Sequence, residues 1–237
     1  MERADKVLVE LGLSKSRTKA ADSIKQGLVQ SHGILVKKPS QLIDREECEL
    51  AAGRQYVGRG ALKLEIAFKH FQIDCQGLII ADIGASTGGF TEIVLIAGAK
   101  EVFCVDVGHG QLAEDLINDE RVHNLEGVNI RNGVELGKKV DLCVVDLSFI
   151  SLKLVFEEIL KLLNDHGQAV VLMKPQFEVG KKALGKNGVV KNKDLREDLL
   201  KDFNAYFAGF NFSNIKYIES PIVGRSGNVE YLYHLKK

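Results

Sequence analysis

A glycine-rich segment after an apolar run carries the clearest chemical signal in this chain. Residues 78–83 (LIIADI) are followed by residues 84–90 (GASTGGF), which predicts a buried strand, a tight turn and a helix. Gly84 permits the turn, and Gly88 and Gly89 let the backbone approach a ligand at the helix N-terminus. Ser86 replaces the second glycine of a nicotinamide-binding turn, and no lysine follows as in a phosphate-binding loop, so we expect another ligand.

Two aspartates flank this turn at a spacing that suits an adenosine ligand. Asp82 comes just before the turn, where a carboxylate suits a ligand with an ammonium group, such as the methionine part of S-adenosylmethionine. Asp106 follows a second apolar run, where it can accept hydrogen bonds from both ribose hydroxyls. The alternative is that both aspartates are helix caps in an unrelated α/β protein.

Two further charged residues directly follow apolar runs. Asp146 follows residues 142–145 and Lys174 follows residues 170–173, so both are predicted at the carboxyl ends of parallel strands. Ligands bind at that edge in open α/β sheets. The alternative is an ion pair that only joins neighbouring strand ends.

The elements that must position these residues form two parts. Apolar periodicity predicts strands at 78–83, 101–107, 140–147 and 169–173 that alternate with helices, which indicates a parallel, doubly wound α/β sheet. The pattern before residue 61 predicts a small α+β unit followed by a glycine-rich linker. We expect domains at 1–52 and 61–237 with a linker at 53–60.

The expected elements of the first domain are helices over 3–11 and 16–26, a hairpin over 28–36 and a strand at 49–51. The second domain is expected to begin with a helix over 61–70.

Charge is divided unevenly although the net charge is zero. Residues 1–63 hold 12 Lys or Arg against 8 Asp or Glu, which suggests that the N-terminal part faces RNA. The alternative for its basic residues is a solvated helix face.

The four cysteines and six histidines have no metal-binding spacing, so we expect reduced cysteines and no metal. No signal peptide or membrane-length apolar run is present, and we expect a cytoplasmic protein.

Taken together, these motifs resemble the TlyA/hemolysin A family of ribosomal RNA methyltransferases. Residues 3–50 are similar to the RNA-binding domain named after the fourth small-subunit ribosomal protein. Residues 61–235 are similar to the Rossmann-like, S-adenosylmethionine-dependent FtsJ-type domain. The resemblance is carried by the glycine turn and by residues 58–64 (GRGALKL), 144–151 (VVDLSFIS), 173–178 (MKPQFE) and 227–231 (GNVEY). Tyr56 and His109 depart from residues common in the family.

The resemblance implies a Lys-Asp-Lys-Glu tetrad at Lys63, Asp146, Lys174 and Glu230. Without it, Lys63 would be an ordinary helix residue and Glu230 an ordinary strand residue. Lys174 is the leading candidate to accept the proton of a ribose 2′-hydroxyl or to stabilise the developing alkoxide, while Asp146 orients it. The segment after Asp146 lacks the Asn-Pro-Pro-Tyr-like sequence or nucleophilic cysteine of many base methyltransferases, so we predict ribose methylation, at cytidine by resemblance.

The resulting hypothesis is a ribosomal RNA 2′-O-methyltransferase that uses S-adenosylmethionine. Its alternatives are a non-catalytic ribosomal RNA-binding or ribosome assembly factor, a nicotinamide dehydrogenase and a hemolysin, and lysis is disfavoured because no membrane-active segment is present. The predicted cofactor contacts are Asp82, Gly84, Ser86, Thr87, Gly88, Gly89, Phe90, Asp106, Asn129 and Asp146, and the predicted RNA contacts are Arg3, Lys15, Arg17, Lys19 and Lys25.

Overall fold

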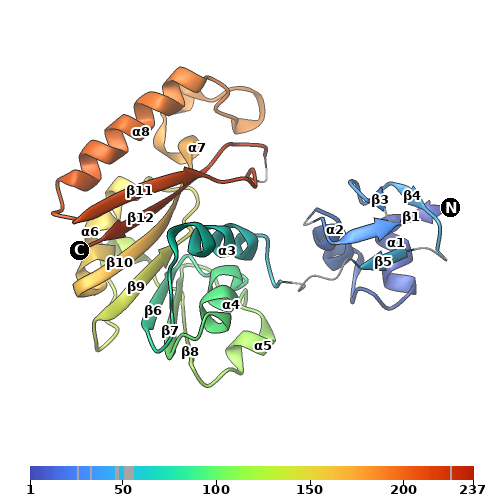
Figure 1. Cartoon of the computed structure of the whole chain (residues 1–237), viewed down its shortest axis with the longest axis horizontal. Coiled ribbons are helices and arrows are strands. Elements are labelled where there is room, and N and C mark those ends of the chain that lie inside the picture. The colour runs from blue at the N-terminus through green and yellow to red at the C-terminus, as the bar shows by residue number, and fades with distance from the viewer. Residues whose placement is uncertain (26, 33, 46–47, 51–55, 225) are drawn as a thin grey trace. The chain divides into compact units, whose positions relative to one another are not determined.

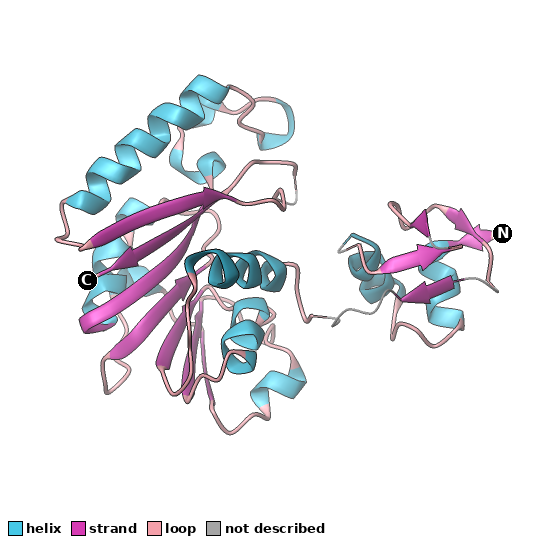
Figure 2. Cartoon of the chain, in the orientation of Figure 1, coloured by secondary structure: helices cyan, strands magenta, loops and turns pink. Residues whose placement is uncertain are grey.

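The computed structural model describes residues 1–25, 27–32, 34–45, 48–50, 56–224 and 226–237. They form two compact units, Met1–Arg59 and Gly60–Lys237, and each is described by itself (Figures 1 and 2). Residues 53–55 of the predicted linker lie outside the described residues. The predicted boundaries at 52 and 61 stay predictions.

The N-terminal unit packs two short helices against small sheets. The predicted helices and hairpin are confirmed, and Ser16 caps the second helix by accepting a hydrogen bond from the Lys19 N–H at 3.2 Å. Leu8, Ile24 and Val29 lie in its core. A ribbon of two-residue strands was not predicted, because such strands are too short to show periodicity. The elements are β1 (Glu2–Arg3), α1 (Ala4–Glu10), α2 (Arg17–Lys25), β2 (Val29–Ser31), β3 (Ile34–Leu35), β4 (Leu42–Ile43) and β5 (Cys48–Leu50), in sheets of order β1-β4 and β3-β2-β5.

The C-terminal unit is built on one mixed sheet. Within the described residues its strand order is β11-β12-β10-β9-β6-β7-β8. The run from β10 to β8 is parallel, whereas β12 is antiparallel to both of its neighbours. The predicted doubly wound α/β class is confirmed, and the antiparallel return of β12 was not predicted. The strands are β6 (Ile79–Ile83), β7 (Glu101–Asp106), β8 (Val122–Glu126), β9 (Val140–Val145), β10 (Leu163–Met173), β11 (Asn214–Glu219) and β12 (Tyr231–Lys236).

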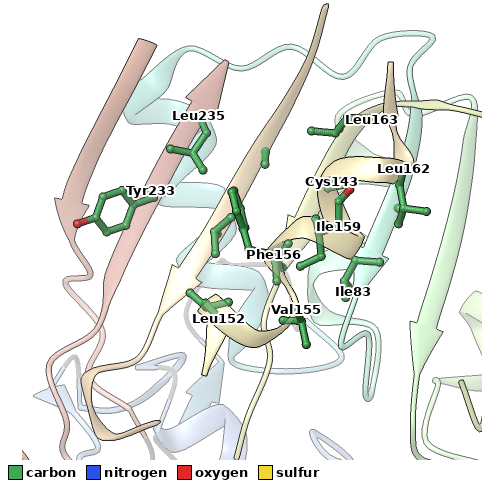
Figure 3. Close-up of a cluster of buried hydrophobic side chains, with 14 of the residues drawn as sticks. Ile83, Cys143, Leu152, Val155, Phe156, Ile159, Leu162, Leu163, Tyr233 and Leu235 are labelled. Carbon is green, nitrogen blue, oxygen red and sulfur yellow. Dashed lines mark hydrogen bonds between the residues drawn. The ribbon is translucent and has the colours of Figure 1, made fainter. Parts of the chain in front are cut away.

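Helices cover both faces of this sheet, because alternate strand residues point to opposite sides. On one face α6 and α8 supply Phe156, Phe203 and Phe207, which pack with Tyr233 of β12. Figure 3 shows part of this apolar cluster, with Phe156 and Tyr233 labelled. The other face is covered by α3 and α4 (Figure 1). The helices are α3 (Gly60–Phe71), α4 (Gly89–Ile96), α5 (Glu114–Ile117), α6 (Phe156–Leu162), α7 (Pro175–Glu178) and α8 (Lys193–Ala208).

The register of the central strands brings the predicted site residues to one edge. Ile83 of β6 is paired with both Val105 of β7 and Val145 of β9, and Val145 is paired with Val171 of β10. The next residues along these parallel strands therefore leave the sheet side by side. They include the Gly84 turn, Asp106, Asp146 and Lys174.

Candidate active site

Lys174 and Asp146 form an ion pair at the carboxyl edge of the sheet. The Lys174 Nζ lies 2.5 Å from Asp146 Oδ1 and donates a hydrogen bond to Ser148 Oγ at 2.9 Å. Lys174 is buried, because it directly follows the core strand β10 and precedes Pro175, which begins α7. A buried ammonium needs a charged partner, and Asp146 at the end of β9 provides it. The structure thus brings these two predicted residues together.

Lys63 and Glu230 form a second buried pair. Lys63 lies on α3 and Glu230 just before β12, and the Lys63 Nζ is 2.5 Å from Glu230 Oε2. The Gln176 Nε2 donates to Glu230 Oε1 at 3.3 Å. Gln176 was not predicted, although it lies two residues after Lys174 in the motif MKPQFE. Through α7 it connects the two lysine–carboxylate pairs.

The glycine turn lies against the Asp146 backbone. Gly84 has φ +87°, as the predicted tight turn requires, and an added Cβ would lie 2.6 Å from the Asp146 carbonyl oxygen. Gly88 has φ +91°. A Cβ there would meet only the ends of the Leu116 and Leu112 side chains, so the positive φ, which other residues rarely adopt, explains why this position is glycine. Its contact with a cofactor stays a prediction.

Asp82 is fully buried beneath the turn. Its Oδ2 accepts a hydrogen bond from Thr91 Oγ1 at 2.6 Å, and its Oδ1 has no hydrogen-bond partner among the described residues. Burial raises the pKa of this carboxyl from 3.8 to about 7. Thr91 lies on α4 and was not predicted. An unsatisfied buried oxygen is uncommon and marks a place where a water molecule or ligand group belongs.

Asp106 ties the end of β7 to the glycine turn. Its Oδ2 accepts the Ser86 N–H at 2.8 Å and its Oδ1 accepts the Gly108 N–H at 2.7 Å. The exposed Ser86 hydroxyl donates to Gln111 Oε1 at 3.1 Å. Gln111 was not predicted, because no motif marks it. The carboxylate is thus held in place at the position predicted for a ribose contact.

The remaining predicted cofactor residues differ in accessibility. Thr87 is exposed, whereas Gly89 and Phe90 are buried within α4. A Cβ on Gly60 would lie 3.5 Å from the Phe90 ring and 3.4 Å from Asp146 Oδ2. Asn129 is exposed and its side chain accepts the Arg131 N–H at 3.0 Å. Phe90 and Asn129 therefore have structural roles, and their contact with a cofactor stays a prediction.

An exposed aromatic ring lies beside the Lys174 pair. Phe149 is 91% exposed with φ +67°, a conformation that is costly for a bulky residue. Its ring centroid lies 5.2 Å from that of Phe177, and the Phe177 centroid is 6.0 Å from the Lys174 Nζ. In the sequence, Phe149 is marked only as part of the motif VVDLSFIS. Its exposure could not be read from the sequence.

Glu178 makes a second connection between the segments that carry Lys174 and Asp146. Its carboxylate accepts the Ser151 hydroxyl at 2.5 Å and the Leu152 N–H at 2.9 Å, so the end of α7 is fixed to the loop after β9. Burial raises the pKa of Glu178 above its usual 4.5. This clamp was not predicted.

Comparison with known proteins shows which family the chain belongs to. The FtsJ-like methyltransferase family matches residues 56–237, and the S4 domain matches residues 2–47. The chain belongs to the FtsJ-like methyltransferase family. This membership confirms the resemblance seen in the sequence and the predicted class of enzyme.

Relatives match nearly the whole chain, including both of its domains. The 16S/23S rRNA (cytidine-2′-O)-methyltransferase TlyA of Mycobacterium tuberculosis is 42% identical over 99% of this chain and 89% of its own. Hemolysin A of Brachyspira hyodysenteriae is 38% identical over 98% of each. A solved structure from Streptococcus thermophilus with a hemolysin name is 40% identical, with a TM-score of 0.76, and the match covers 100% of this chain and 88% of its own.

The predicted RNA-binding residues lie in the S4 domain. Arg3, Lys15, Arg17, Lys19 and Lys25 are all exposed. Arg3 and Arg17 both bind the carboxylate of Asp5. In the described parts of the chain, no group of histidine, cysteine or acidic residues could hold a metal ion, and no helix is long and apolar enough to cross a membrane.

Proposed function

We propose that this protein transfers a methyl group from S-adenosylmethionine to the ribose 2′-hydroxyl of a cytidine in ribosomal RNA. The observation that carries the proposal is the ion pair of the buried Lys174 with Asp146 beside the Gly84 turn, in a member of a methyltransferase family. The name of the Mycobacterium tuberculosis relative supports this substrate and this position of methylation.

The ends of β6 and β7 fit S-adenosylmethionine. The unpartnered Asp82 Oδ1 would be satisfied by a donor of the ligand or by a water molecule that the ligand holds. Asp106 accepts two backbone N–H groups, and an ionised carboxylate has further acceptor sites for ribose hydroxyls. When bound, S-adenosylmethionine supplies an electrophilic methyl group.

Lys174 acts on the 2′-hydroxyl. Its ammonium group has three donors; it donates one hydrogen bond to Ser148 and forms an ion pair with Asp146, so a donor remains for the ribose oxygen. Lys174 either accepts the hydroxyl proton as a neutral amine or stabilises the developing alkoxide as an ammonium. Asp146 fixes the Nζ, which aligns the oxygen for in-line attack.

Lys63 and Glu230 hold this arrangement. Glu230 receives both the Lys63 ammonium and the Gln176 amide, and Gln176 is on the same short helix that follows Lys174. The second pair therefore fixes α7, and with it the direction of the Lys174 side chain. A displacement of about 1 Å far from the chemistry can cost on the order of a hundredfold in rate.

The surroundings of Lys174 favour ribose over base as the target. The segment after β9 reads Asp146-Leu147-Ser148-Phe149 and has no group suited to base methylation. Phe149 and Phe177 offer aromatic faces on which an unstacked base could rest, as RNA-binding proteins often provide. A base held there would leave its ribose near the Lys174 Nζ.

The S4 domain supplies affinity for ribosomal RNA without taking part in the chemistry. Its exposed residues Arg3, Lys15, Arg17, Lys19 and Lys25 can follow a phosphate backbone. We keep the domains proposed from the sequence, an RNA-binding part at 1–52 and a catalytic part at 61–237 with a linker at 53–60. A cytoplasmic location also stays a prediction.

The product of the reaction tests this proposal. Purified protein is incubated with methyl-labelled S-adenosylmethionine and with 16S or 23S ribosomal RNA or the corresponding subunits, and the RNA is digested to nucleosides. We expect label in 2′-O-methylcytidine. Label on a base would refute ribose methylation. RNA binding without transfer to any of these substrates would instead support the non-catalytic assembly factor.

A further inference from the structure

One buried carboxylate in the S4 domain holds two exposed arginines. The Asp5 side chain is 6% exposed, whereas those of Arg3 and Arg17 are 47% and 59% exposed. Arg3 donates from Nε at 3.0 Å and from Nη2 at 3.1 Å. Arg17 donates from Nη2 at 2.8 Å and from Nε at 3.3 Å. Arg3 therefore binds both oxygens of the carboxylate, whereas both Arg17 donors reach the same oxygen, Oδ2, and each guanidinium is held by two hydrogen bonds to the same carboxylate.

The two arginines reach Asp5 from different elements. Arg3 ends β1 and precedes α1, Asp5 lies in the first turn of α1, and Arg17 begins α2. Each guanidinium uses its Nε and Nη2 edge on Asp5. In the described part of the chain, neither Nη1 has a hydrogen-bond acceptor, so each arginine keeps donors for another group. A planar guanidinium fixed on one edge can bind a phosphate with the other.

The charges in this cluster favour an anionic ligand. The hydrogen bond from Arg3, followed by the contacts with Arg17, lowers the pKa of Asp5 to about 2, so the carboxylate stays ionised at neutral pH. Two cations and one anion leave a net positive cluster. The carboxylate also offsets the repulsion between the two guanidinium groups, which lets them stay close together.

We propose that Asp5 is a positioning residue for RNA: it holds Arg3 and Arg17 in one fixed orientation from which both can bind neighbouring phosphates. The inference rests on the proposed RNA-binding function of the S4 domain. A free arginine side chain loses much rotational freedom when it binds. Asp5 removes most of that loss before RNA arrives.

The sign of one substitution separates positioning from simple electrostatics. Asp5→Asn removes a negative charge next to two cations, so long-range attraction alone predicts tighter RNA binding. If Asp5 positions the arginines, the same change weakens binding, by roughly tenfold for two released side chains. The slope of affinity against salt concentration should change little, because both arginines keep their charge and their phosphates.

The chain offers a matched control on the same helix. Glu10 of α1 forms ion pairs with Lys6 at 3.4 Å and with Arg45, and Glu10→Gln changes the net charge by the same amount. Binding of the full-length variants to 23S ribosomal RNA is measured by filter binding over a range of salt concentrations. We expect Glu10→Gln to leave binding unchanged or slightly tighter, while Asp5→Asn weakens it. Equal or tighter binding by Asp5→Asn would overturn the proposal.

A double-mutant cycle tests whether Asp5→Asn acts through the two arginines or only by destabilising the S4 domain. Asp5→Asn is introduced into the Arg3→Ala, Arg17→Ala background. If Asp5 acts through the arginines, it has no further effect on RNA affinity there. A weakening as large as in the parent protein would show a merely structural role and overturn the inference. If Arg3→Ala, Arg17→Ala itself leaves affinity unchanged, the assignment of RNA binding to these arginines fails instead.

Discussion

Asp5 in the N-terminal unit and Asp146 and Glu230 in the C-terminal unit all bind cationic side chains, but the two units bury different partners. In the C-terminal unit the lysines are buried, at 10% side-chain exposure for both Lys63 and Lys174; Glu230 is buried with Lys63, and Asp146 is 23% exposed. In the N-terminal unit only the carboxylate is buried and the arginines face solvent.

This difference matches two different tasks. A buried lysine with a fixed partner acts on one atom, which suits the alignment of a single hydroxyl. Exposed arginines with free donor edges suit a long ligand with many equivalent phosphates. The same pairing of charges therefore serves chemistry in one unit and recognition in the other.

The largest expected effect comes from removing the buried cation at the centre of the site. Lys174→Ala should lower the single-turnover rate of methyl transfer by about 10²- to 10⁴-fold. Lys174→Arg tests its role: an arginine cannot accept a proton near neutral pH, but it keeps the positive charge. Loss with both variants indicates proton transfer, whereas substantial activity in Lys174→Arg indicates charge stabilisation. Full activity in Lys174→Ala would contradict the assignment.

The next effect concerns the stability of the C-terminal unit. Glu230→Gln leaves the buried Lys63 ammonium without a charged partner, which should lower the free energy of unfolding by about 3–5 kcal/mol. Glu10→Gln, whose partners are more exposed, should cost about 0–1 kcal/mol. Urea unfolding of the C-terminal unit can be followed by tyrosine fluorescence, since four of the five tyrosines lie there, and that of the N-terminal unit by hydrogen exchange of its helix amides. A similar small loss for both variants would break the comparison.

Two buried aspartates should give pH dependences of opposite sign. Asp5 has arginine partners, and its lowered pKa contributes stability that is present above about pH 4 and is lost as the pH falls toward 2. Asp82 has no cation, and its pKa is raised to about 7. Because the folded state then holds a proton that the unfolded state releases, stability falls as the pH rises from about 4 to 7. Asp82→Asn should remove that fall, as measured by unfolding of the C-terminal unit between pH 4 and 8; an unchanged pH profile would contradict it.

The smallest effect concerns the cofactor alone. Asp106→Ala removes the predicted ribose acceptor and should weaken S-adenosylmethionine binding by about 1–3 kcal/mol. Calorimetry measures the affinity, and RNA binding by the S4 domain should not change. Asn129→Ala, at an exposed neighbouring position, tests a contact that is so far only a prediction. Unchanged cofactor affinity in Asp106→Ala would refute the ribose contact.

Sequence reasoning located the parts of the site that lie next to regular strands. Asp82, Asp106, Asp146 and Lys174 could be placed, because apolar runs mark parallel strands and ligands bind where such strands end. Lys63 and Glu230 came only from the family resemblance. They are 167 positions apart, and no local pattern indicates that such distant residues pair.

The features that sequence reasoning missed depend on tertiary packing. Gln176 is hydrogen-bonded to a residue 54 positions away, and Glu178 to residues 26 and 27 positions away. The exposure of Phe149 depends on a positive φ that a non-glycine residue rarely adopts. The antiparallel return of β12 was missed because one strand has the same alternation in either direction. In the S4 domain the arginines were predicted, but the aspartate that holds them was not.

The most direct test measures rate and affinity separately on the same substrate. Single-turnover methylation of 23S ribosomal RNA at saturating protein gives the rate, and filter binding gives the affinity. We predict that Lys174→Ala loses rate and keeps affinity, while Arg3→Ala, Arg17→Ala loses affinity and keeps the saturating rate. Full rate in Lys174→Ala, or arginine variants that lower the saturating rate with unchanged affinity, would contradict the division of chemistry and recognition between the two units.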